Sequence, residues 1–70
     1  MIKYYIFGYT VVHKGHVCQM GDGVAGVELP CTAIEARGTI KTYINDSLLD
    51  SKYDLREINL TLLKEWNENE

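Results

Sequence analysis

The sequence is poor in several features that mark large classes of protein. Its 70 residues include only two cysteines and one proline, and no apolar run approaches the ~20 residues needed to cross a bilayer. Two cysteines are too few for the disulfide-rich scaffolds of small secreted proteins. An apolar fraction of 46% with a single proline argues against a disordered chain. We therefore expect one folded domain.

Concentrated positive charge is also missing. The seven lysines and arginines are spread along the chain, and ten acidic residues give a formal net charge of −3. A protein that grips phosphates needs a basic face, so we do not expect nucleic-acid binding. Contact with a basic protein partner is compatible with this charge. Met1-Ile2-Lys3 is followed by tyrosines and glycine rather than by a secretory signal, so the cytoplasm, with reduced thiols, is the expected location.

The first half of the chain has the pattern of a β-hairpin. β-Branched and aromatic residues predict a strand from Ile2 to His13, with apolar side chains on both faces. Lys14-Gly15 predicts the turn, and a return strand is expected from His16 to about Met20. Residues 21–26 are too glycine-rich for a regular strand, so we expect a loop or bulge there, with pairing resumed towards Leu29.

The second half predicts one helix and a third strand. Thr32 and Glu35 have the spacing of a capping box, and apolar residues at helical spacing predict a helix from Ala33 to Asn45. Residues 58–62 alternate as in a half-buried strand, residues 63–68 are compatible with strand or helix, and 67–70 form a polar tail that frays. The fold class is therefore α+β, in the order β-β-α-β. We expect one domain over 1–70, with one helix packed on one face of a small, mostly antiparallel sheet.

This architecture leaves the second face of the sheet open. The first strand offers aromatic side chains to both faces, so the open face should carry an apolar patch of the kind that binds a partner or a second copy in a homodimer. Tyrosines are favoured at interfaces, although they also serve as core residues in a domain short of phenylalanine. We expect the open face, with Tyr5 and Tyr9, and the loop from Gly21 to Gly26 to bind a partner, with Asp22 and Glu28 at the rim.

His13, His16, Cys18 and Cys31 have the ligand types of a tetrahedral zinc site. Only the two histidines are closely spaced, and nothing in the sequence places Cys31 beside the others. A hairpin turn with exposed histidines and small buried thiols is the favoured interpretation, and a zinc-stabilised interaction module is an alternative. Catalysis by a cysteine would require a nearby histidine and a substrate pocket. Because a domain of this size has little room for such a pocket, we expect neither an enzyme nor a cofactor.

Gly21, Gly23 and Gly26 spell the GxGxxG pattern of dinucleotide-binding proteins. That pattern holds a pyrophosphate only where it joins a strand to a helix, and the residues that follow it here cannot open a helix directly. A glycine loop can still offer backbone N–H groups to an anion, with His13 or His16 supplying charge. The alternative function is therefore an oligomeric sponge that sequesters a small, nucleotide-like ligand.

Three segments carry a resemblance to a known class: the opening MIKYYIFGYT, the central CTAIEARGTIKTYIND and the closing REINLTLL. Together they resemble the short, acidic, single-domain proteins of bacteriophages and other mobile elements, which include anti-CRISPR proteins and other inhibitors of host defence. The resemblance is architectural and carries over no functional residues. It implies a viral, non-enzymatic inhibitor that docks on a bacterial protein or complex in the host cytoplasm.

Overall fold

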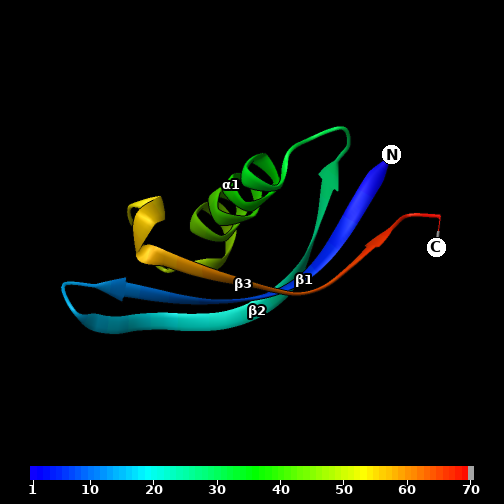
Figure 1. Cartoon of the computed structure of the whole chain (residues 1–70). Helices are drawn as coiled ribbons and strands as arrows, with labels where there is room; N and C mark the ends of the chain where they lie inside the picture. Colours follow the sequence, from blue (N-terminus) through cyan, green and yellow to red (C-terminus); the bar gives the residue numbers. More distant parts are fainter. Residues whose placement is uncertain (70) are drawn as a thin grey trace.

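The computed structural model describes residues 1–69 and has the element order predicted from the sequence (Figure 1). One antiparallel sheet has the strand order β2-β1-β3 and is covered on one face by a single helix, so the predicted α+β fold is confirmed. The elements are β1 (Ile2–His13), β2 (His16–Glu28), α1 (Ala33–Tyr43), the short helical turns η1 (Ile44–Leu48) and η2 (Leu55–Glu57), and β3 (Ile58–Asn67).

β1 is the central strand, and its alternation divides the molecule into two sides. Every second residue from Tyr5 to Val11 points towards α1 and is buried with Ala36 and Ile40 of the helix. The helix begins where the sequence predicts, because Thr32 and Glu35 form the capping box: the Glu35 N–H donates to Thr32 Oγ1, and the Thr32 N–H donates to Glu35 Oε1. The core therefore lies entirely between α1 and one face of the sheet.

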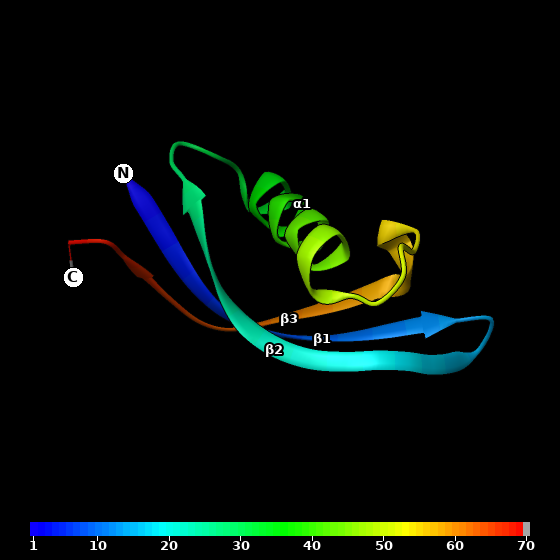
Figure 2. The same cartoon turned by 180° about the vertical axis from the view of Figure 1, so that it is seen from behind.

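The strands bend around the helix. Both views show α1 on the concave side of the sheet, and the face without a helix is the convex side (Figures 1 and 2). The molecule is elongated, with extents of 40 × 17 × 17 Å. The β1–β2 hairpin turn, in which Lys14 and Gly15 both have positive φ, lies at one end, and both chain termini lie at the other.

β2 continues without interruption through residues 21–26, so the predicted loop or bulge is wrong. Gly21 pairs with Tyr9, and Gly23 pairs with Phe7. A Cβ atom added at Gly21 would lie 2.7 Å from Tyr9 Oη, and one at Gly23 would lie 2.9 Å from Phe7 Cζ. The aromatic rings of β1 thus occupy the space of the missing side chains, which is why glycine is needed within this strand.

The C-terminal segment is a strand. Of the two structures that the sequence allows for residues 63–68, strand or helix, the strand is the one observed. β3 runs to Asn67. The following N–H, of Glu68, donates to the Ile2 carbonyl oxygen at 2.9 Å, and Glu68 Oε1 accepts from the Ile2 N–H at 3.0 Å. The prediction of a frayed tail from residue 67 is therefore wrong as far as Glu68, while Glu70 lies outside the described residues.

Candidate functional site

The residues predicted to bind a partner lie on opposite sides of the sheet. Tyr5 and Tyr9 are 5% and 8% exposed and pack under α1, so the expectation that they contact a partner is wrong. The reason is the register of β1, whose odd-numbered positions face the helix. Asp22 and Glu28 are exposed, and their pairing with Gly8 and Ile2 places them on the open face.

One end of the open face is filled by its own aromatic side chains. Tyr4 pairs with Trp66 of β3, and their rings are stacked at 5.6 Å between centroids with an interplanar angle of 24°. On the other side of Tyr4, a Cβ atom added at Gly26 would lie 3.1 Å from Tyr4 Cε1 and 2.9 Å from Ile2 Cγ2. A side chain at position 26 would therefore collide with Ile2 and Tyr4, although Gly26 itself is exposed.

The rest of the open face carries the apolar patch predicted from the architecture, although with different residues. Its members are more than half exposed: Val17, Met20, Val24 and Leu63. The first three lie on this face because they pair with even-numbered residues of β1. Sequence reasoning predicts a patch on this face but does not identify its residues, because both alternating sets of β1 are apolar and the glycines of β2 predict an interruption. We refer to these four residues as the open-face patch.

A shallow hollow of about 460 Å³ lies within this face, above Gly8 of the central strand. Gly8 has no side chain to fill it, and the nearest heavy atom to an added Cβ would be the Gly21 carbonyl oxygen at 3.9 Å. Met20 and Leu63 supply apolar walls, and Asp22, with Asn59 and Thr61, supplies polar ones. The hollow is therefore of a size and chemistry to receive one apolar side chain flanked by hydrogen-bond donors.

At the hairpin end, His13 has a structural role. His13 Nδ1 is hydrogen-bonded to Glu57 Oε2, and the His13 ring meets the Tyr53 ring edge to face at 5.6 Å. The hydrogen bond to His13 is the main reason why the pKa of Glu57 is lowered, and burial raises the pKa of the Tyr53 hydroxyl. His13 is thus half-buried and ties the hairpin to the segment before β3, contrary to the expected exposed position, whereas His16 is exposed.

The four candidate zinc ligands are not brought together. Cys31 lines a hollow with Lys3 and Tyr5, whereas His13 is ten residues farther along β1, which is about 30 Å at ~3.3 Å per residue. Within residues 1–69, no group of three or more histidine, cysteine or acidic side chains has an arrangement that could hold a metal ion. Cys18 is exposed, contrary to the expected buried thiol, and both cysteines are free.

The glycines of the predicted anion loop are also separated. Gly21 and Gly23 face the rings of Tyr9 and Phe7 on the helix side, while Gly26 lies beside Ile2 and Tyr4 on the open side. All three belong to a regular ladder with β1, so their N–H groups do not converge as in a phosphate-binding loop. His13 and His16 lie at the hairpin end, beyond these glycines. Within the described part of one chain, these glycines and histidines therefore do not form an anion site together.

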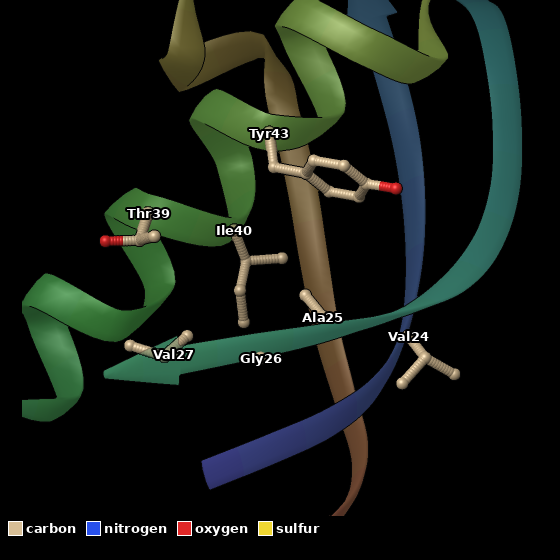
Figure 3. Close-up of a pocket in the computed structure, with 7 residues that line it drawn as sticks. All are labelled: Val24, Ala25, Gly26, Val27, Thr39, Ile40 and Tyr43. Carbon is tan, nitrogen blue, oxygen red and sulfur yellow. The ribbon is translucent and has the colours of Figure 1, made fainter. Parts of the chain in front are cut away.

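A second concave feature lies on the helix side, between α1 and the outer edge of β2. It is a groove of about 400 Å³ lined by β2 residues 24–27 and by Thr39, Ile40 and Tyr43 of α1 (Figure 3). The Tyr43 ring extends over the groove, and the Val24 side chain points away from it towards the open face. Within residues 1–69, β2 has no neighbouring strand on this side, so the groove borders an edge of the sheet.

Comparison of the chain with models of protein families, with curated proteins and with solved structures gives no match. Within residues 1–69, none of the helices has the length and apolar composition that a membrane span requires.

Proposed function

We propose that the chain is a non-enzymatic binding protein that docks on a protein partner through the convex open face of its sheet. The observation that carries this proposal is the open-face patch, in which Val17, Met20, Val24 and Leu63 are each more than half exposed on one side of the molecule. An apolar patch gathered on one face of a soluble domain is a common mark of an interaction surface.

The shape and charge of this face define the partner. A convex surface is matched by a concave one, so the partner should offer a cleft that accepts the curved sheet. The hollow above Gly8 accepts one apolar side chain, and Asp22 on its wall favours a basic group beside it. Glu28 lies six residues farther along β2, opposite Ile2, where it pairs with the Met1 amino group at 3.3 Å. The overall charge of −3 speaks against a nucleic acid as the ligand.

The biological role follows from the resemblance to small phage proteins. A stoichiometric inhibitor needs a docking surface and no catalytic constellation, and the open face supplies such a surface. We therefore propose a bacterial protein or protein complex as the partner and the host cytoplasm as the place of action. Zinc binding and ligand sequestration are not proposed, because the residues on which they depended are dispersed.

The test is affinity capture from bacterial lysates with quantitative mass spectrometry, using the wild-type chain and two variants. Met20→Lys with Leu63→Lys places two charges on the open-face patch, where both residues are solvent-exposed. Ile34→Lys is the matched control, because Ile34 is 84% exposed on the helix and lies outside the patch. Circular dichroism shows that each variant is folded.

We expect a protein that is captured by the wild type and by Ile34→Lys and is lost with the doubly charged variant. Its affinity, measured afterwards by calorimetry with the purified protein, should follow the same order. Capture of the same proteins by all three chains, or equal loss with both variants, would refute docking through the open face.

A further inference from the structure

The two edges of the sheet differ in how they are protected against pairing with another strand. On β3, Leu63 is an extra residue that shifts the register against β1, Lys64 follows it, and Arg37 of α1 donates from Nη2 to the Leu60 carbonyl oxygen at 2.7 Å. Bulges, lysines and covering side chains are the devices by which proteins block sheet edges. The β3 edge is therefore poorly suited to accept a strand.

The edge formed by β2 has a long unprotected part. From Met20 to Glu28, nine consecutive residues pair with β1 in unbroken register, without proline, lysine or bulge, and the charged residues among them are Asp22 and Glu28. β2 has a neighbouring strand on one side only within residues 1–69. Strands in globular proteins are usually about 5–6 residues long, so this is an unusually extended free edge, of the kind that pairs with another chain.

The free part of the edge begins at a defined place. Gln19 Nε2 donates to the Leu48 carbonyl oxygen at 3.0 Å, and the Asp50 N–H donates to Gln19 Oε1 at 3.2 Å. The segment after α1 therefore packs against β2 at Gln19. Beyond this contact lies the groove of about 400 Å³, whose wall on the helix side includes Tyr43, which is 42% exposed. A strand added to the edge would lie beside this groove and bury apolar surface there (Figure 3).

We propose that the occupant of this edge is a second copy of the chain, with the two β2 strands paired antiparallel about a two-fold axis at Val24. The dimer then contains one continuous six-stranded sheet with both helices on the same face. The interface is isologous, so each copy supplies the same edge and the same groove. The interface is the backbone edge of β2, which shares Met20 and Val24 with the open-face patch. The proposal concerns self-association alone and does not rest on the proposed function.

The sequence of β2 is compatible with itself in this register. With Val24 opposite its own copy, Asp22 lies opposite the partner's Gly26, and Glu28 lies opposite the partner's Met20, so no two carboxylates are directly opposed. On the helix side, Gly21 and Gly23 lie opposite the partner's Val27 and Ala25. The rings of Tyr9 and Phe7 lie over Gly21 and Gly23 in each copy, so no β2 side chain at these two positions obstructs the new strand pair. The two grooves then lie side by side, and the Tyr43 rings of both copies can be covered.

The test is sedimentation velocity of the purified chain over a wide range of concentration. The wild type should move from the 8.0 kDa monomer towards twice that mass as concentration rises. Val24→Lys and Val24→Glu each place like charges at the axis and should raise the dissociation constant at least about tenfold. Val17→Lys is the matched control on the same strand and face, outside the free edge, and should dimerise like the wild type; Val24 and Val17 are 55% and 61% exposed.

The decisive measurement is a mixture of the two charged variants. If Val24 lies at the axis, Val24→Lys and Val24→Glu attract each other in a mixed dimer, and association should return when they are combined. A wild type that stays monomeric at every concentration would overturn the proposal. The free edge would then be available to a strand of a different protein. Self-association of Val24→Lys as strong as that of the wild type, or a mixture that associates no better than its components, would also overturn the proposal.

Discussion

The substitution Gly23→Ala tests the least expected element of the fold, the continuous strand through residues 21–26. In the structure, Gly23 lies opposite Phe7, and an added Cβ would be 2.9 Å from Phe7 Cζ and 3.4 Å from Cε1. Phe7 is fully buried and packs in the same cluster as Ile40 and Ile44. The ring therefore has little space into which it can retreat from the new methyl group.

Two opposing effects determine how much Gly23→Ala changes the free energy of unfolding. Overpacking a core typically costs about 1–3 kcal/mol, while replacing glycine by alanine in a strand returns about 0.5–1 kcal/mol of conformational entropy. The free energy of unfolding should therefore fall by about 1–2 kcal/mol. In a domain of this size that corresponds to a decrease in Tm of roughly 5–15 °C.

Gly38→Ala is the matched control, because the same methyl group is added where nothing lies within 4 Å. Gly38 is inside α1, and alanine is favoured over glycine in a helix by about 1 kcal/mol. The two substitutions should thus change Tm in opposite directions. Thermal and urea unfolding, followed at one protein concentration by circular dichroism and by the fluorescence of Trp66, measure both.

A second-site change separates the ring contact from a general effect on the strand. Phe7→Leu removes the atoms that the new methyl group meets, so Gly23→Ala should cost less in a Phe7→Leu background than in the wild type. If Gly23→Ala raises Tm as Gly38→Ala does, the ring does not cover Gly23 and the register of β2 is wrong. The same conclusion follows if the cost of Gly23→Ala is unchanged in the Phe7→Leu background.

Three further predictions concern a cap, an ion pair and the hollow. Thr32→Ala removes one half of the capping box and should lower the free energy of unfolding by about 1 kcal/mol in urea titrations; an unchanged midpoint would contradict the cap. The hydrogen bond from Arg56 lowers the pKa of Asp54 from 3.8 to about 2, so its stabilisation is complete above pH 3.8 and is lost as the pH falls through 2. Asp54→Asn should therefore be less stable than the wild type at neutral pH, and the difference should shrink below pH 3.8; a constant difference in urea midpoint down to pH 2 would contradict this. Gly8→Val should fill the hollow of the open face, raise stability by about 0.5–1 kcal/mol and abolish capture of the partner; retained capture would exclude the hollow from the docking surface.

The elements that the sequence predicts correctly are those with local signals. The first strand has the bounds Ile2–His13, because its β-branched and aromatic run ends at Lys14-Gly15, a pair suited to a turn with positive φ. The start of α1 is equally local, since Thr32 and Glu35 satisfy each other's backbone N–H groups. The helix ends at Tyr43 rather than at Asn45, where the chain passes into η1.

The features that sequence reasoning misses depend on contacts between distant segments. Gly21 and Gly23 look like loop residues until the rings of Tyr9 and Phe7 are placed above them, and no local pattern carries that information. The orientation of Tyr5 was undetermined for a similar reason, because both alternating sets of β1 are apolar and only the helix position distinguishes them. The sequence therefore predicts the candidate docking surface as a face of the sheet but does not identify its residues.

The placement of both termini at one end has a mechanical consequence. β1 and β3 run antiparallel and side by side, with Lys3 opposite Asn67, and Glu68 is hydrogen-bonded to Ile2. A force that pulls the two termini apart therefore acts across the ladder rather than along it. It loads the pair nearest the ends first and then each following pair in turn, so β3 should peel from β1 like a zipper at low force. The β1–β2 hairpin, whose turn lies at the far end, is loaded only after β3 has come away.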